Sequence, residues 1–68
     1  MNVVLNGEPR ELLHGATLDD AIEASGAPDG RRGVAVALDG EVVPRGEWGT
    51  TTLAEGARVE VLQAVQGG

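Results

Sequence analysis

Short aliphatic runs that end at turn dipeptides are the first pattern along the chain. Residues 2–5 are mostly aliphatic and stop at Asn6-Gly7, a dipeptide that readily adopts the positive φ angles of a two-residue hairpin turn. The return arm contains Pro9, which has no N–H to donate, so we expect this arm to lie at a sheet edge or to begin after Pro9. The pattern predicts a first β-hairpin.

Apolar positions with helical spacing follow the hairpin. They recur at i, i+3 and i+4 and form a single stripe, made of Leu18, Ala21 and Ile22. Thr17 precedes the stripe and can act as an N-cap, and Gly26 follows it and can supply the left-handed residue that ends a helix. These signals predict a two-turn helix over residues 18–25.

A second hairpin is predicted in the middle of the chain, where the spacing changes to that of strands. Residues 34–38 are apolar on both faces, as expected for an interior strand. Asp39-Gly40 is again a favourable turn dipeptide, and it leads into residues 41–43 before Pro44 ends the pairing.

The last strand is predicted over about residues 57–65. Val59 and Val61 alternate with charged residues, which assigns one face to the core and the other to solvent. Leu62 belongs to the other face, which no predicted element covers. We therefore expect it to be exposed, and its position near the C-terminus makes it a candidate anchor for a partner.

This order of elements predicts an α+β fold, with one helix packed on one face of a mixed sheet of four or five strands. The final strand can lie centrally beside the first, and the whole arrangement suggests a ubiquitin-like β-grasp. A chain of 68 residues has room for one domain only. We assign residues 1–65 to this domain and residues 66–68 to a flexible C-terminal tail.

Composition narrows the classes of function. Acidic residues outnumber basic residues 11 to 5, so the formal net charge is −6, and nucleic acid is not expected as a partner. The absence of cysteine excludes disulfides, thiolate metal sites and a cysteine nucleophile, and His14 alone cannot form a metal site. No apolar stretch is long enough for a membrane span, and the N-terminal residues lack the features of a signal peptide. We expect a cytoplasmic protein without a membrane partner.

The sequence ends in Val65-Gln66-Gly67-Gly68, directly after the last predicted strand. Glycine has no side chain to obstruct a narrow channel, and four extended residues reach about 13 to 14 Å. A terminal carboxylate is ionised at neutral pH and is a poor electrophile, so acyl chemistry requires prior activation, for instance as an acyl-adenylate. The chain has neither a phosphate-binding glycine loop nor a lysine, so another protein must supply this activation.

A set of motifs in the second half resembles the ThiS family, the sulfur carrier proteins of bacterial thiazole synthesis. The set comprises Val43-Pro44-Arg45, Trp48, Gly56 and the terminal Gly67-Gly68, and the similarity spans the whole chain. The resemblance implies that a partner enzyme adenylates the terminal glycine with ATP, that sulfur replaces the adenylate, and that thiazole synthase consumes the sulfur.

Roles for individual residues follow from this resemblance. Gly68 would carry the acyl-adenylate and then the thiocarboxylate, while Gly67 and Gln66 would thread the tail into a partner's channel. Leu62 and Arg45 are the candidate partner contacts. The chain would be a protein cosubstrate and not an enzyme, with no bound cofactor, and its partners would be an adenylating enzyme of the ThiF type, which uses ATP, and a thiazole synthase of the ThiG type.

Other interpretations stay open at this point. The chain can be a β-grasp sulfur carrier of another pathway, of the kind represented by the small subunit of molybdopterin synthase, or a β-grasp interaction module in which the glycines have no role. Short length and the combination of Val43-Pro44-Arg45 with Trp48 favour the thiazole pathway. Trp48, the sole aromatic residue, is expected to close one end of the core and not to serve as a ligand platform.

Overall fold

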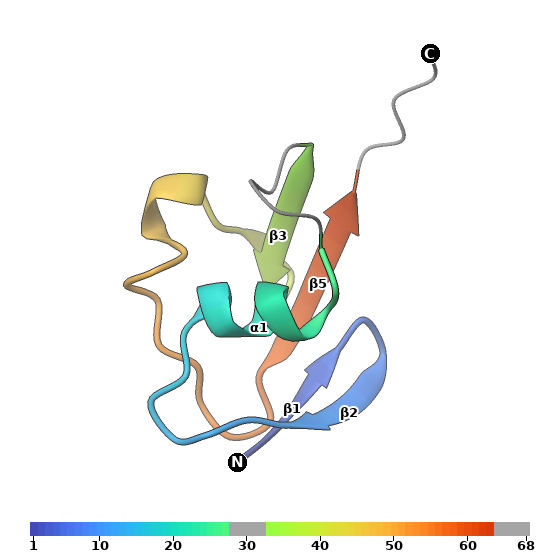
Figure 1. The fold of residues 1–68 in the computed structure, drawn as a ribbon, viewed down its shortest axis with the longest axis vertical. Helices are drawn as coiled ribbons and strands as arrows, with labels where there is room; N and C mark the ends of the chain where they lie inside the picture. Colours follow the sequence, from blue (N-terminus) through green and yellow to red (C-terminus); the bar gives the residue numbers. More distant parts are fainter. Residues whose placement is uncertain (28–32, 64–68) are drawn as a thin grey trace.

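The computed structural model describes residues 1–27 and 33–63, which form a five-stranded sheet and one α-helix (Figure 1). The elements in chain order are β1 (Asn2–Leu5), β2 (Glu8–Glu11), α1 (Leu18–Ala24), β3 (Val34–Leu38), β4 (Glu41–Val42), the 3₁₀ helix η2 (Arg45–Glu47) and β5 (Arg58–Gln63). The strand order is β2-β1-β5-β3-β4, in which β1 and β5 are parallel and the other neighbours are antiparallel. This mixed sheet with one helix on one face confirms the predicted β-grasp fold.

Both hairpin turns have the backbone geometry that their sequences predict. The φ angles are 51° at Asn6 and 82° at Gly7 in the first turn, and 50° at Asp39 and 87° at Gly40 in the second. Positive φ at both central residues is the mark of a type I′ turn, whose twist matches that of the flanking strands. The strand β4 ends at Val42, one residue before the predicted end, but the pairing reaches Val43, whose N–H donates to the Val36 carbonyl at 2.9 Å.

The proline in the first hairpin lies on an outer edge of the sheet, as predicted. Leu12 N–H donates to the Met1 carbonyl, so the backbone N–H and carbonyl groups of the even-numbered residues of β2 point toward β1. Pro9 is odd-numbered, and its nitrogen therefore faces the outer edge, where no described strand requires a donor.

The helix begins and ends at the residues with the expected capping chemistry. The Asp20 carboxylate accepts hydrogen bonds from the Thr17 backbone N–H at 2.8 Å and the Thr17 hydroxyl at 3.3 Å. Gly26 has a φ of 80°, and the helix stops at Ala24, one residue earlier than predicted, with Ser25 as the C-cap. The apolar stripe is buried as predicted: Leu18, Ala21 and Ile22.

The core lies between α1 and the sheet, and Trp48 closes one end of it. Its side chain is 3% exposed, and the indole Nε1–H donates to the Val43 carbonyl at 2.9 Å. This confirms the expectation that Trp48 is a core residue. The segment at residues 50–53 is tied to the start of the helix, because Leu53 N–H donates to the Ala16 carbonyl and Thr52 forms a bridge with Thr17.

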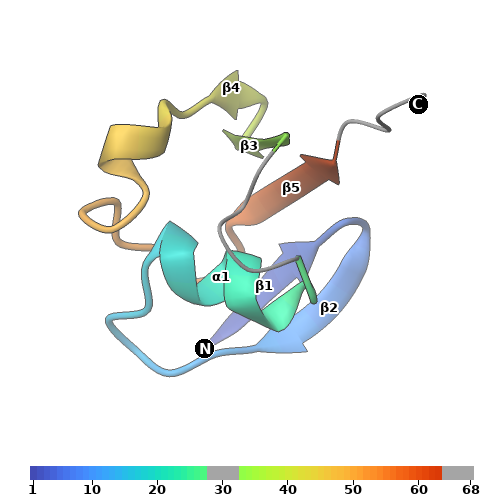
Figure 2. The same ribbon diagram turned by 45° about the horizontal axis from the view of Figure 1, so that its top comes forward.

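The helical part of the described chain is small. The one α-helix has seven residues, and none of the helices described is long and apolar enough to cross a membrane. Figure 2 shows α1 packed against one face of the sheet, with the opposite face free of any helix in the described ranges.

Candidate functional site

The C-terminal end of β5 is the candidate site, because the terminal glycines follow this strand in the sequence. β5 is the central strand of the sheet, as predicted, with β1 on one side and β3 on the other. It pairs with β3 from Leu38↔Val59 to Val34↔Gln63. Its last residue, Gln63, is therefore still held in the sheet, so the chain leaves the domain from a fixed position.

The predicted tail residues lie outside the described residues. These are Gln66, Gly67 and Gly68, together with Ala64 and Val65 at the end of the predicted last strand. The domain boundary at residue 65 and the roles assigned to the tail therefore stay predictions.

The face of the sheet opposite α1 carries a small apolar surface near the end of β5. We call it the open-face patch, and it consists of Ala35, Ala37, Val42 and Leu62. Leu62 pairs directly with Ala35, and Val42 pairs with Ala37, so the four side chains share one face across three strands. Glu60, which also pairs with Ala37, lies on the same face. Leu62 is 63% exposed and Val42 is 78% exposed. The expected exposure of Leu62 is confirmed.

The structure does not bring the two candidate partner contacts together. Leu62 lies on the central strand, whereas Arg45 begins η2, which follows the edge strand β4. The Arg45 guanidinium carbon is 5.8 Å from the centroid of the Trp48 ring, a cation–π distance. This contact gives Arg45 a role within the chain, and its role toward a partner stays a prediction.

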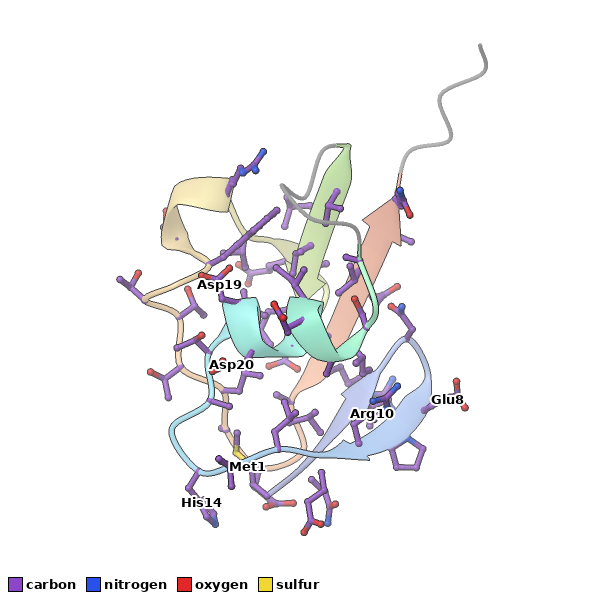
Figure 3. All side chains as sticks on the ribbon, in the orientation of Figure 1. Met1, Glu8, Arg10, His14, Asp19 and Asp20 are labelled. Carbon is purple, nitrogen blue, oxygen red and sulfur yellow. The ribbon has the colours of Figure 1, made fainter. Side chains whose placement is uncertain are left out.

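Other polar residues singled out by the sequence lie away from the end of β5. Figure 3 shows His14 at the end of the molecule remote from the arrowhead of β5, in an exposed loop. It also shows Asp19 and Asp20 on different sides of the first turn of α1, where Asp20 caps the helix. In residues 1–27 and 33–63, no group of three or more His, Cys, Asp or Glu residues is arranged to hold a metal ion.

Two features of the site were missed by the sequence analysis. The first is the extent of the open-face patch: residues 34–38 are apolar on both faces, but none of the described elements covers the second face, and Ala35 is exposed. The second is the side chain of Asn6, whose Oδ1 accepts a hydrogen bond from Val61 N–H at 2.7 Å. The signal at Asn6 concerned its turn alone, and nothing local points to a partner 55 residues away.

Comparisons with known proteins agree with the fold and cover the chain to its last residue. The ThiS family model matches residues 3–68. A crystal structure of the thiamine biosynthesis protein ThiS from Geobacter metallireducens is 30% identical, with a TM-score of 0.80 and full coverage of both chains. A solution NMR structure of a thiamine biosynthesis protein from the same organism is 30% identical, with a TM-score of 0.79, over all of this chain and 88% of that one. No curated protein matches the chain significantly.

Proposed function

Because the chain belongs to the ThiS family, we propose that it is a sulfur carrier of thiamine biosynthesis whose C-terminal Gly68 becomes a thiocarboxylate and donates sulfur for thiazole synthesis. The observation that supports this most directly is a family match that extends through Gly67-Gly68 to the last residue. In this proposal the chain is a protein cosubstrate, it binds no cofactor of its own, and it acts in the cytoplasm.

The proposed chemistry takes place on the carboxyl carbon of Gly68. In the active site of an adenylating enzyme of the ThiF type, a carboxylate oxygen attacks the α-phosphorus of ATP, and pyrophosphate leaves. A sulfur nucleophile at the oxidation level of sulfide then adds to the acyl carbon, and AMP leaves with the oxygen through which it was attached. The activation is needed because the ionised carboxylate is a poor electrophile. A thiazole synthase of the ThiG type would consume the sulfur.

In this proposal the folded domain fixes the position of β5, and the tail that follows it carries the reacting group. The buried cluster includes Val59, and Val61 packs against it from the same strand, so the folded body holds β5 firmly. Gly67 and Gln66 would then cross the partner's channel and deliver Gly68 to ATP. Glycine next to the reacting residue keeps the tail narrow at the point where the channel must exclude water.

The proposed docking surface for the adenylating enzyme is the open-face patch. Single exposed apolar residues are ordinary, but here Leu62 and Val42 lie on one face of the sheet, with Ala35 and Ala37 of β3 between them. A partner that receives the tail must lie close to this end of β5. Arg45 is proposed as a secondary contact at the rim, on the far side of β4.

Replacing Leu62 with serine is expected to weaken binding to the adenylating enzyme about tenfold, because an apolar anchor near the centre of an interface is lost. The melting temperature should change little, since Leu62 is 63% exposed in the free protein. Isothermal titration calorimetry measures the affinity. Leu13→Ser is the matched control, because Leu13 is 85% exposed and precedes His14 at the remote end of the molecule. Equal effects of the two substitutions would contradict the docking surface.

The experiment that tests the carrier function is intact-protein mass spectrometry. The chain is incubated with a ThiF-type adenylating enzyme, ATP, magnesium and sulfide, and the expected product has one terminal oxygen replaced by sulfur. A parallel reaction without ATP should leave the mass unchanged. An unmodified chain in the presence of an adenylating enzyme that is active on its own carrier would exclude the proposal.

A second step of the same experiment distinguishes the pathway. Addition of a ThiG-type thiazole synthase with its substrates should return the modified chain to its original mass as sulfur is consumed. Consumption by a molybdopterin synthase large subunit, and not by thiazole synthase, would assign the carrier to the other pathway.

A further inference from the structure

The two sides of β5 are paired over different lengths. On one side, β3 pairs with β5 as far as Gln63. On the other side, β1 pairs with it only at Val4↔Arg58 and Leu5↔Val59, and then turns away at Asn6-Gly7. The second half of β5 therefore has a strand partner on one side only among the described elements.

Asn6 makes the last hydrogen bonds between the β1 side of the sheet and β5. Its backbone N–H donates to the Val59 carbonyl at 2.9 Å, and its side-chain Oδ1 accepts from the Val61 N–H at 2.7 Å. Since alternate residues of a strand face the same edge, the Val61 carbonyl and the N–H and carbonyl of Gln63 also face this side. No described strand pairs with those three groups, and we call the stretch from Val61 to Gln63 the open edge of β5.

The outer edges of the sheet differ from this open edge. The exposed edge of β2 carries Pro9, which cannot donate, and β4 has only two residues. Proline and short strands are devices by which proteins prevent pairing with another chain at an edge. The open edge of β5 carries no proline. Asn6 covers the Val61 N–H, and within the described ranges no strand pairs with the N–H and carbonyl of Gln63.

A hollow of about 500 Å³ reaches the start of the open edge. It lies between the first hairpin turn and residues 58–62 of β5, and its lining combines the apolar Val4 and Leu62 with the charged Arg58 and Glu60. Leu62 lies at the end of the hollow next to the open edge, whereas Val4 pairs with Arg58, four residues earlier in β5. An added strand gains affinity from main-chain hydrogen bonds and specificity from pockets for its side chains. The open edge offers backbone groups that no described strand pairs with, beside the apolar Leu62.

We propose that the open edge of β5 accepts an extended segment of the adenylating enzyme as an additional strand, with an apolar side chain of that segment seated against Leu62. The proposal rests on the carrier function above. The adenylating enzyme is the occupant because residues 64–68 follow Gln63 directly, so the protein that receives the tail must pass beside this edge. The added strand would hold the root of the tail in register with the partner's active site.

Gln63→Pro tests the proposal by removing one donor from the open edge. The N–H of Gln63 faces away from β3, so the substitution should leave the sheet paired. Affinity for the adenylating enzyme is expected to fall about tenfold, because an acceptor in the partner loses its donor at a desolvated position. Glu11→Pro is the matched control, since the Glu11 N–H faces the outer edge of β2. This variant should bind the adenylating enzyme as tightly as the parent does.

Gln63→Ala distinguishes a contact made by the backbone of residue 63 from one made by its side chain. It removes the same side chain as the proline variant and keeps the N–H. A loss of affinity as large as that of Gln63→Pro would assign the contact to the side chain and overturn the added strand.

Amide hydrogen exchange of the parent chain gives a test that needs no variant. The N–H of Leu62 faces β3 and should exchange slowly in the free chain and in the complex. The N–H of Gln63 should exchange quickly in the free chain and at least tenfold more slowly in the complex. Unchanged exchange at Gln63 in the complex would overturn the proposal, and so would a proline variant that binds as tightly as the parent.

The outcomes also distinguish this proposal from the carrier function. If the parent gains sulfur but the open edge shows neither effect, the added strand is wrong and the carrier function stands. If the parent neither binds the adenylating enzyme nor gains sulfur, both fall. A free chain that forms a dimer in sedimentation, and a monomer after Gln63→Pro, would show that a second copy occupies the edge instead.

Discussion

Deletion of Gly68 is expected to abolish adenylation and thiocarboxylate formation while the melting temperature stays within about a degree of the parent's value. The shortened chain still ends in a carboxylate, but that group stops about 3.5 Å short of the position where, in the proposed reaction, the parent's carboxylate meets ATP. In-line attack requires the reacting atoms to be placed within a fraction of an ångström to about one ångström, so this displacement removes the reaction.

Replacement of Gly67 with valine should have the same outcome for a different reason. A β-branched side chain restricts the backbone and widens the tail where the channel is narrowest. Ordering each tail residue in the channel costs about 1 to 2 kcal/mol, and this cost must be offset by close backbone contacts that a branched side chain prevents.

Stability should be insensitive to both changes, because the buried cluster of the described residues ends in β5 at Val59, with Val61 packed against it. The measurements are thermal unfolding and intact mass after incubation with the adenylating enzyme, ATP and sulfide. Gly46→Ala is the control, since a Cβ at Gly46 would meet nothing within 4 Å. Adenylation of either tail variant at the parent's rate would show that the tail is not the site, and unfolding of either would make the glycines structural.

Trp48→Ala is expected to destabilise the fold by about 3 to 5 kcal/mol, which is typical for the loss of a large buried aromatic side chain. Trp48 is 3% exposed, and its removal leaves a cavity at one end of the core as well as the Val43 carbonyl without its donor. A domain of this size has a total stability of roughly 3 to 10 kcal/mol, so much of the variant should be unfolded at room temperature. Urea denaturation followed by circular dichroism measures this effect.

Two further substitutions divide the effect into its parts. Trp48→Phe keeps much of the packing and loses the hydrogen bond to Val43, so it should cost less than Trp48→Ala. Arg45→Ala removes the cation above the ring at an exposed site and should cost about 0.5 to 1 kcal/mol. A denaturation midpoint of Trp48→Ala equal to that of the parent would contradict the role of Trp48 in the core. It would favour the alternative that Trp48 contacts a ligand.

Some features at the end of β5 depend on adjacent residues, and others depend on residues far apart in the sequence. The sequence alone predicts the terminal Gly67-Gly68 motif, because glycine is recognised by its missing side chain. It also predicts the exposure of Leu62, because alternation along the strand places this residue on the face away from the helix. The open-face patch also needs Val42, which lies 20 positions earlier, and its membership depends on the register between β3 and its two neighbours. Periodicity within one strand carries no information about that register.

The sequence by itself determined the local elements, because each depends on the stereochemistry of a few adjacent residues. Asn6-Gly7 and Asp39-Gly40 tolerate positive φ, Pro9 cannot donate, and Gly26 ends the helix. Only the tertiary structure decided where β1 leaves β5 and which backbone groups it leaves open, since the bond from Asn6 to Val61 spans 55 residues. Such contacts are chosen by the packing of the whole core, in which burial of the strands and helix together outweighs any local preference.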